Sequence, residues 1–412
     1  MASNSLLTIA MITAESARIL SNNLTLARTV NRDYDDEFAI KGAKIGQTLS
    51  VRKPARYNIR VGSVVDIQAQ TETYAQLTFT NPVGVDLAFT SQELTFSLDD
   101  FSQRVLKPAV VRVANQIDHD GFGLVNQTFN YVGTPGTAIT GSSTLDARTA
   151  ILQAAARLYD NDAPVGSDEL SFIHASAFNA VLAGTNATLF NPMREVSEIY
   201  VKGMQGDFGG FRHYLNQLTP AHTNGVYGGT PVANSVTPQT GSSIITAGWT
   251  PTTTSLNVGD VITFAGVYGV NPQTQQVYNW LQPFTITAQS VTDGSGNSTL
   301  QVSPSVVASG PFQNVSQAIP NNAAITVIGG SGVTSQQSIG FHRDAFMLAT
   351  QELVVPTGGI EDGMFVKDPE TDIGIRFVGQ FDIRTGQHIR RLDAMYAWAV
   401  LYPQLCTRLF TT

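Results

Sequence analysis

The sequence predicts an α+β fold that is interrupted by an inserted all-β domain, and three observations carry this prediction. No lysine or arginine lies between Arg212 and Arg343, and only Asp260 and Asp293 are acidic from position 220 to position 335. Within that neutral stretch, short apolar runs alternate with polar residues as strands do. On both sides of it, helix-type apolar spacing and strand-like runs occur together. A composition shift with two edges indicates an inserted domain rather than a tail.

The N-terminal part of the chain predicts a helix followed by a long extended arm. Residues 5–29 carry apolar side chains at helical spacing, and helix breaks follow at residues 31–36. Strand-like alternation then occurs at residues 48–51, 57–61 and 64–80. These runs are rich in threonine and glutamine and lack a continuous apolar face. A two-stranded arm of this kind is not stable alone, so we interpret it as needing a partner surface.

Helices and short strands are predicted between the arm and the insertion. A long helix covers residues 101–125, and Pro108 either delays its start or kinks it. A second helix covers residues 145–159, capped by Ser143 or Thr144. Its expected buried face consists of Ile151, Leu152, Ala155 and Leu158. The remaining elements are a strand at residues 170–174, a short helix at residues 176–182 and a strand at residues 198–201.

The insertion and the C-terminal part both predict strands. The apolar runs of the insertion lie at residues 258–268, 284–291, 299–307 and 324–328. They favour a small antiparallel barrel or sandwich over the alternative of a disordered, low-complexity linker. Residues 339–355 mix helix and strand patterns. Two long apolar runs at residues 374–384 and 388–401, separated by Thr385-Gly386-Gln387, predict a terminal β-hairpin.

Composition excludes several functional classes. The formal net charge is −8 and the pI is about 5.2, whereas a domain that neutralises nucleic-acid phosphates is normally basic. The single cysteine, Cys406, excludes internal disulfides and cysteine-based zinc sites. No apolar run is long enough to span a membrane, and the first 20 residues lack the basic start of a signal peptide. Only 14% of the residues are charged, and such a neutral polar surface suits a protein with many neighbours.

Each motif that suggests chemistry fails on a necessary residue. No glycine-rich phosphate loop contains any of the six lysines. Asp207-Phe208-Gly209 has no accompanying kinase motifs. Asp118-His119-Asp120-Gly121 resembles part of a calcium loop, but its twelfth position is Phe129 where a glutamate is required. We therefore predict that the protein is not an enzyme and has no catalytic, cofactor-binding or metal-binding residues, so that Asp118 and Asp120 are solvated helix-end residues.

The order of elements, together with two C-terminal stretches, resembles a known family. The first stretch is Phe341-His342-Arg343-Asp344-Ala345-Phe346. The second runs through Gly374-Ile375-Arg376 and Phe381-Asp382 to Arg391-Leu392-Asp393-Ala394-Met395-Tyr396-Ala397-Trp398. Together they resemble the closing part of tailed-bacteriophage major capsid proteins with the HK97-like fold. Residues Gly259-Asp260-Val261-Ile262-Thr263-Phe264-Ala265-Gly266-Val267 resemble the insertion domain of the short-tailed-phage branch.

The resemblance implies a division of the chain and a function. It implies an N-terminal arm (1–44), an extended E-loop (45–95), a peripheral domain with a spine helix (96–144), a first axial part (145–220), an inserted β-barrel domain (221–335) and a second axial part with the C-terminal hairpin (336–412). It also implies self-assembly through pentamers and hexamers, with a scaffolding protein, into the icosahedral shell. That shell, with a portal at one vertex, encloses double-stranded DNA without binding it sequence-specifically. Assembly would occur in the host bacterial cytoplasm, and the product would be the virion capsid.

Candidate inter-subunit contacts follow from charge and position. Asp66 and Glu72 lie in the arm, and Arg376, Arg390 and Arg391 lie in the terminal hairpin. Arginine suits such contacts because its planar guanidinium forms bidentate ion pairs, although each of these arginines could equally be a surface residue. Some relatives crosslink through lysine and asparagine, and Lys41, Lys44 and Lys53 lie near the arm, but no acid is placed to catalyse that reaction.

Two other functions stay open at this point. One is a tail or decoration protein whose β domain binds glycans, because Tyr268, Tyr278, Trp280 and Phe284 could stack on sugars. The other is a hydrolase, for which no catalytic pair is visible. We expect the four aromatic residues to fill the core of the insertion instead. The sequence leaves open whether a separate decoration protein binds.

Overall fold

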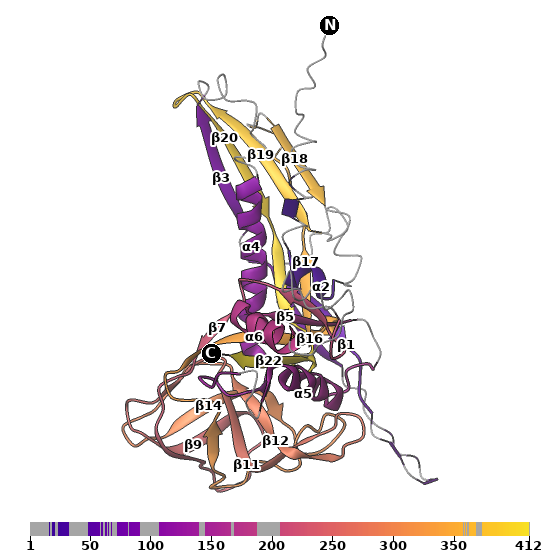
Figure 1. The fold of residues 1–412 in the computed structure, drawn as a ribbon, viewed down its shortest axis with the longest axis vertical. Helices are drawn as coiled ribbons and strands as arrows, with labels where there is room; N and C mark the ends of the chain where they lie inside the picture. Colours follow the sequence, from indigo (N-terminus) through magenta and orange to yellow (C-terminus); the bar gives the residue numbers. More distant parts are fainter. Residues whose placement is uncertain are drawn as a thin grey trace. The chain divides into compact units, whose positions relative to one another are not determined.

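A computed structural model describes most of the chain (Figure 1). The described residues are 16, 19–20, 24–32, 48–57, 59–60, 62–63, 65, 67, 72–80, 82–90, 107–139, 145–165, 169–187, 207–356, 358, 360, 362–367 and 373–411. They form two compact units. Unit 1 takes its residues from 1–51, 74–121 and 347–399, and unit 2 takes them from 52–73, 122–346 and 400–412. The predicted strand at residues 198–201 lies outside the described residues.

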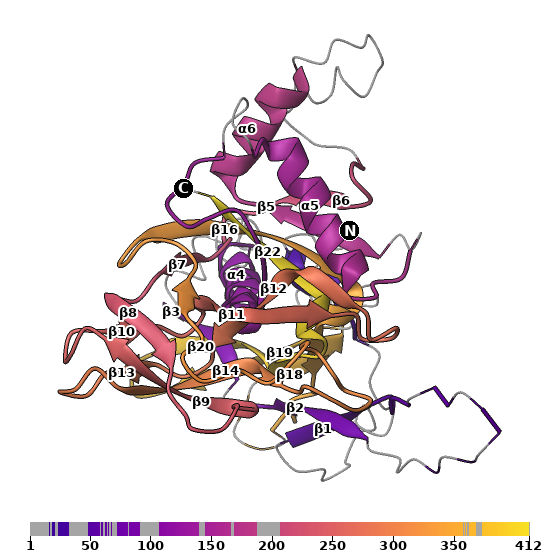
Figure 2. The ribbon, with the colours of Figure 1, turned by 90° about the horizontal axis from the view of Figure 1, so that it is seen from below.

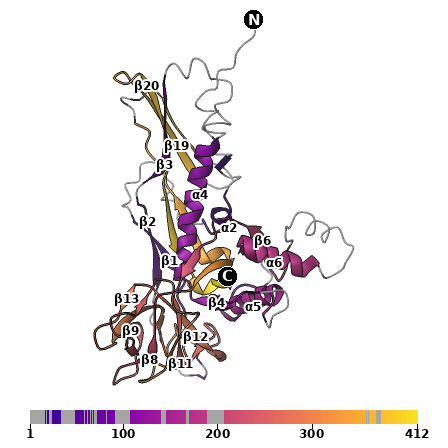
Figure 3. The ribbon, with the colours of Figure 1, turned by 60° about the vertical axis from the view of Figure 1, so that its left-hand side comes forward.

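Unit 1 is built on a four-stranded antiparallel sheet and one long helix. The sheet has the order β18-β19-β20-β3, with β18 (Asp362–Lys367), β19 (Gly374–Asp382), β20 (Gln387–Ala394) and β3 (Val83–Thr90). The helix is α4 (Lys107–Gly123), drawn beside β19 and β3 in Figure 3. Pro108 is its second residue, where a proline is tolerated because the first backbone N–H groups need no helical partner.

Two further strand pairs complete unit 1 around an apolar cluster. Strand β1 (Thr48–Lys53) pairs with β2 (Thr73–Thr78), and β17 (Phe346–Thr350) pairs with β21 (Tyr396–Val400). The short helix α2 (Leu26–Thr29) is buried through Leu26 and Ala27. The apolar cluster consists of Leu49, Leu77, Phe79, Met347, Ala349, Ala397 and Ala399. This cluster anchors the start of the extended arm.

The body of unit 2 is a mixed sheet covered by two helices (Figure 2). Its strand order is β4-β22-β16-β5-β6, and β7 pairs separately with β16. The strands are β4 (Asn130–Val132), β5 (Leu170–His174), β6 (Arg212–Leu215), β7 (Ala221–Thr223), β16 (Thr334–His342) and β22 (Cys406–Thr411). The β22–β4 and β5–β6 pairs are parallel. Helix α5 (Ala147–Asp160) contacts this sheet and α6 (Ser176–Ala187).

The rest of unit 2 is a closed β-barrel with its own core. The order of its strands is β15-β11-β12-β14-β9-β8, and a bridge between Val232 and Ala324 joins the first to the last. The strands are β8 (Gly229–Ala233), β9 (Gly241–Trp249), β11 (Val261–Val270), β12 (Val277–Ile286), β14 (Ser298–Val306) and β15 (Ile325–Val327), with β10 (Ser255–Leu256) pairing with β13 (Ser290–Val291) at the side. Closure removes the free edges that would invite aggregation.

The structure confirms the α+β class and most elements, and it corrects several details. Helix α5 is capped by Asp146, which accepts a 2.6 Å hydrogen bond from the N–H of Thr149, rather than by Ser143 or Thr144. Leu152 is 49% exposed, because the buried stripe of α5 runs through residues 147, 150, 151, 154, 155 and 158 and Leu152 lies beside it.

Two of the strand predictions also need correction. The described residues of the run 57–61 belong to no strand, because alternation alone does not supply a pairing partner. In the run 64–80, the described strand is β2 at residues 73–78. The predicted C-terminal hairpin is present as β19 and β20. Its second run divides at Met395 into β20 and β21, which belong to different sheets, and β22 follows.

Candidate functional site

The arm carries several large apolar side chains that are exposed to solvent in the single chain. Beyond the buried Leu49, Leu77 and Phe79, Ile59 is 88% exposed and Ile67 is 91% exposed. Tyr57, Val65 and Tyr74 are also exposed. A series of exposed large apolar groups on one extended segment marks a surface that another molecule covers.

The sequence predicts two acidic contact residues on the arm, Asp66 and Glu72. Asp66 lies outside the described residues. The Glu72 carboxylate Oε2 lies 3.7 Å from Nη1 of Arg52, and both side chains are largely exposed. An exposed pair of this kind contributes about 0–1 kcal/mol to stability.

The three predicted arginines lie in the β18-β19-β20-β3 sheet, where a buried acid organises two of them. Asp393 is 1% exposed and accepts hydrogen bonds from Nη2 of Arg376 at 2.5 Å and from Nε of Arg391 at 2.7 Å. Arg376 also donates to the carbonyl of Val354 at 2.8 Å. Arg391 lies 3.6 Å from Asp86. The hydrogen bond to Asp393 raises the pKa of Arg391. Register places these charges on one face of the sheet.

Arg390 lies on the opposite face of β20 from Arg391, since neighbouring residues of a strand alternate. Its guanidinium fills the space above Gly379, where a Cβ would lie 1.7 Å from Nη1. The Arg376 side chain is mostly buried in its contacts within the sheet, whereas the Arg391 side chain is half-exposed and can also contact another molecule. The sequence reasoning missed Asp393, although it lies in the quoted stretch and pairs directly with Arg376 in the register.

Replacing Asp393 with asparagine is expected to destabilise unit 1. The change leaves two guanidinium groups without their carboxylate, at a cost of about 2–3 kcal/mol after allowing for the exposure of Arg391. Urea unfolding of the full chain measures this cost. D86N is the matched control, because Asp86 is the exposed member of the same group and its loss should change little. Equal effects of D393N and D86N would contradict this account.

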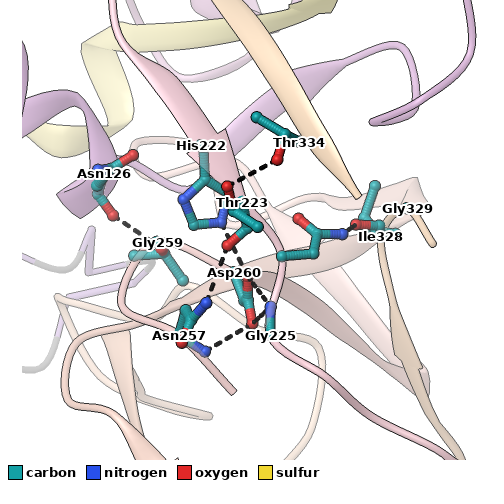
Figure 4. Close-up of polar contacts among 12 residues, drawn as sticks. Asn126, His222, Thr223, Gly225, Asn257, Gly259, Asp260, Ile328, Gly329 and Thr334 are labelled. Atoms are coloured by element: carbon teal, nitrogen blue, oxygen red, sulfur yellow. Dashed lines mark hydrogen bonds and ion pairs between the residues drawn. The ribbon is translucent and has the colours of Figure 1, made fainter. Parts of the chain in front are cut away.

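A buried carboxylate joins the barrel to the body of unit 2 (Figure 4). Asp260 is 0% exposed and accepts a 2.8 Å hydrogen bond from Nε2 of His222. His222 lies in β7, the strand that precedes the barrel in the chain. Asp260 also accepts from the backbone N–H groups of Gly225 and Asn257. One carboxylate thus holds the entering segment and the turn before β11 together.

A buried arginine supports the same junction from β22. The Arg408 side chain is fully buried and donates to the carbonyl of Gly259 at 2.8 Å. Burial lowers the pKa of Arg408 to about 10, while the nearby carboxylate of Asp260 opposes that shift. The returning segment is fixed by Asn224, whose amide donates to the carbonyls of Ile328 and Gly330. The sequence analysis noted Asp260 as one of two acids in the neutral stretch but did not predict its structural role, and it missed Arg408.

The aromatic residues of the barrel have different roles, which corrects the expectation that all four fill its core. Phe284 is buried in the core and packs edge-on against Phe264. Tyr268 is partly exposed. Tyr278 stacks on Trp280 with centroids 5.0 Å apart, and the Arg157 guanidinium of α5 lies 4.3 Å from the Trp280 ring. Trp280 therefore contacts other parts of its own chain rather than offering an open platform for a sugar.

The calcium-like motif is structural, and its first acid is buried rather than solvated as expected. Asp118 is 1% exposed and accepts hydrogen bonds from the backbone N–H groups of Thr25, Leu26 and Ala27, at the start of α2. Asp120 accepts from the Tyr396 hydroxyl at 2.7 Å. Burial, then this hydrogen bond, raises the pKa of Tyr396. Among the described residues, no group of three or more acidic, histidine or cysteine side chains could hold a metal ion.

In the part of the chain that the structure describes, no helix is long and apolar enough to cross a membrane.

The candidate sites in the described residues are of two kinds. Buried charges hold strands together, and the arm exposes large apolar side chains such as Ile59 and Ile67.

Comparisons with known proteins give one family. A family model described as P22 coat protein, gene protein 5, matches residues 1–410. No curated protein matches the sequence. Among solved structures, a chain of Mycobacterium phage Che8 is 11% identical and has a TM-score of 0.47, covering 94% of this chain and 90% of that chain. A chain in the asymmetric unit of the bacteriophage PhiM1 mature capsid is 8% identical with a TM-score of 0.46, covering 94% and 87%.

Proposed function

The chain belongs to the P22 coat-protein family, and from this premise we propose how its parts build a capsid. It is a phage major capsid protein with an α+β HK97-like fold, and copies of it assemble into the shell of the virion. It is a structural subunit and not an enzyme. We also propose which segments of the chain form contacts between subunits, and with which partners.

The arm is the segment that we assign to a neighbouring subunit. The exposed Ile59 and Ile67 carry this assignment, together with Tyr57 and Val65. Burying one such isoleucine contributes roughly 1.5–3 kcal/mol. Each copy in a closed shell makes the same contact, so modest energies are multiplied by copy number. The arm, residues 45–95, is then an E-loop that lies on the adjacent copy.

The remaining division of the chain follows the family pattern. Of the second axial part expected at residues 336–412, residues 347–399 belong to unit 1 with α4. We therefore assign α4, as the spine helix, and the β18-β19-β20-β3 sheet to the peripheral domain, and we assign the sheet and helices of the body of unit 2 to the axial domain. Residues 221–335 form the inserted barrel. The barrel has its own buried core and is joined to the body through Asp260, His222 and Arg408, which supports treating it as an insertion. Residues 1–44 form the N-terminal arm.

The proposed charged contacts between subunits use side chains at the surface of the sheet and of the arm. Arg391, half-exposed beside Asp86, and Arg390, on the other face, are assigned to neighbouring copies. Glu72 and Asp66 are assigned to the same kind of contact on the arm. Arg376 contributes by holding Asp393, which positions Arg391.

Pentamers and hexamers around a scaffolding protein are the proposed assembly route, in the host cytoplasm, with a portal protein at one vertex. The packaged DNA is enclosed without being held by base-specific contacts. The formal charge of −8 supports this, since an acidic chain does not bind phosphates tightly.

Co-expression with the scaffolding protein of the same phage, followed by cryo-electron microscopy, tests this route. Closed shells with five-fold and six-fold clusters are the expected product, and Ile59 should be covered by a neighbouring copy. A soluble trimer that binds carbohydrate and forms no particles would overturn the proposal in favour of a tail or decoration protein.

A further inference from the structure

Two histidines of the unit 2 body, the buried His174 and the partly buried His213, form a pair. His174 ends β5 and His213 lies in β6, and these strands pair in parallel. Nε2 of His174 lies 2.6 Å from Nδ1 of His213, and the two rings lie edge to edge, with centroids 4.7 Å apart and planes inclined by 16°. We infer that this pair is an acid-sensitive latch that holds the edge strand β6 on its sheet and releases it on acidification.

The hydrogen bonds fix where the protons are at neutral pH. Nε2 of His213 lies 2.9 Å from the carbonyl of Phe208, and a carbonyl only accepts, so this nitrogen carries a proton. In a neutral ring, Nδ1 of His213 is then bare and accepts from the N–H at Nε2 of His174. Nδ1 of His174 is therefore also bare. It is buried and has no hydrogen-bond partner among the described residues.

Adding a proton to the pair is unfavourable while Nε2 of His174 and Nδ1 of His213 are in contact, which we call the closed state. The short Nε2–Nδ1 contact holds one proton, and the contact to Phe208 holds another, so a third must reside on Nδ1 of His174. There it would be a buried N–H with no acceptor on a charged ring, which is costly. A fourth proton requires the 2.6 Å contact to break. The closed pair thus takes up at most one proton, whereas the open pair takes up two.

The surroundings of the pair are apolar. His174 is 1% exposed, and its ring contacts those of Phe172 and Phe178. Burial, and then the nearby His213, lower the pKa of His174 to about 3. Burial likewise lowers the pKa of His213, although the hydrogen bond to Phe208 and the charge of Asp207 partly oppose the shift.

Few other charges lie on the packed elements. Helix α6 and strand β5 carry no other titratable side chain. On the side of β6, Asp207 and Arg212 flank His213 in sequence, and the α5 residue Arg148 lies 5.9 Å from the Phe208 ring. From β16, the pair's neighbour is Ser338, whose hydroxyl accepts from the N–H of Ala175. His342, at the far end of β16, lies 3.1 Å from Glu169. Among the described residues, the hydrogen bond to the carbonyl of Phe208 and the charge of Asp207 favour a charged imidazole on His213.

The sign of the pH effect follows from these positions. The pKa values of both rings are lower in the closed state than in an open, solvated state, where histidine titrates near 6.5. The pair therefore stabilises the closed state fully above about pH 6.5, and this stabilisation is lost as the pH falls below that value. Strand β6 has four residues and pairs only at its β5 side in the described sheet, so it is the element that can leave.

Hydrogen–deuterium exchange of the full chain, read by mass spectrometry and corrected for the intrinsic pH dependence, tests the latch. Both imidazoles take up a proton only when β6 has left the sheet. The fraction of molecules with β6 detached is therefore expected to rise about 100-fold from pH 7.5 to pH 5.5. Amides of barrel strand β11 serve as the internal control and should change little. A rise of less than threefold in β6, or an equal rise in β11, would overturn the proposal.

A variant separates the histidine pair from general acid effects. H174F keeps an aromatic ring and leaves one titrating imidazole, so the rise should fall to about tenfold. H119Q removes an exposed histidine and should keep the 100-fold rise. An unchanged response in H174F would contradict the latch. If H174F does not fold, the comparison of β6 with β11 in the unmodified chain still decides the matter.

Discussion

Replacing Asp260 with asparagine is expected to lower the free energy of unfolding by about 3–5 kcal/mol, as the loss of one partner from a buried charged group does. The carboxylate is fully buried, and its two oxygens accept hydrogen bonds from His222, Gly225 and Asn257. An amide nitrogen in place of one oxygen would face backbone N–H donors. Arg408, fully buried at the same junction, would also lose its nearby negative charge.

Thermal and urea unfolding of the purified chain measure this effect. D293N is the matched control, because Asp293 is the other acid of the 220–335 stretch and its carboxylate is exposed, bonded only within its own turn. We expect D293N to leave the unfolding transition nearly unchanged. A D260N protein as stable as the unmodified chain would show that the junction does not depend on this carboxylate.

Replacing both Ile59 and Ile67 with serine is expected to abolish shell formation while leaving the isolated subunit stable. Both side chains are almost fully exposed, so the subunit loses little, within about 0.5 kcal/mol. In the proposed arm contact, burial of each isoleucine would contribute about 1.5–3 kcal/mol, and every copy would repeat that contact. The contact between two copies should therefore weaken by roughly 100-fold or more.

Light scattering during assembly, with circular dichroism of the subunit, separates the two effects. V236S is the control, because Val236 is 98% exposed on the barrel and lies outside the arm. We expect V236S to assemble normally. Loss of assembly in V236S, or normal assembly of the double variant, would contradict the assignment of the arm to a neighbouring subunit.

Local patterns in the sequence were enough to predict barrel strands β11, β14 and β15, strand β5 and the β19–β20 hairpin, whereas β8 and β9 were missed and the run at residues 284–291 covers only the end of β12. Alternation of apolar and polar residues is a local property, which is why it predicts these strands. The same local reasoning predicted α5 but misplaced its cap, since Ser143, Thr144 and Asp146 are all suitable capping residues. It included Leu152 in the buried face because a helical period alone does not fix the width of the buried stripe.

The buried charges could not be predicted, because each depends on a distant partner. Asp118 was expected to be solvated, but it is buried against α2, whose backbone lies 91–93 positions earlier. Arg408 meets Gly259, 149 positions away, and His174 meets His213 across 39 positions. Nothing in the local sequence around these residues distinguishes them from surface charges. Tertiary pairing decides their role.

The most direct test of the account is sedimentation velocity with negative-stain electron microscopy of the purified full chain, with and without the scaffolding protein. The family assignment predicts closed shells, or capsomers that convert to shells when the scaffolding protein is added. A stable monomer or trimer under all conditions would contradict it.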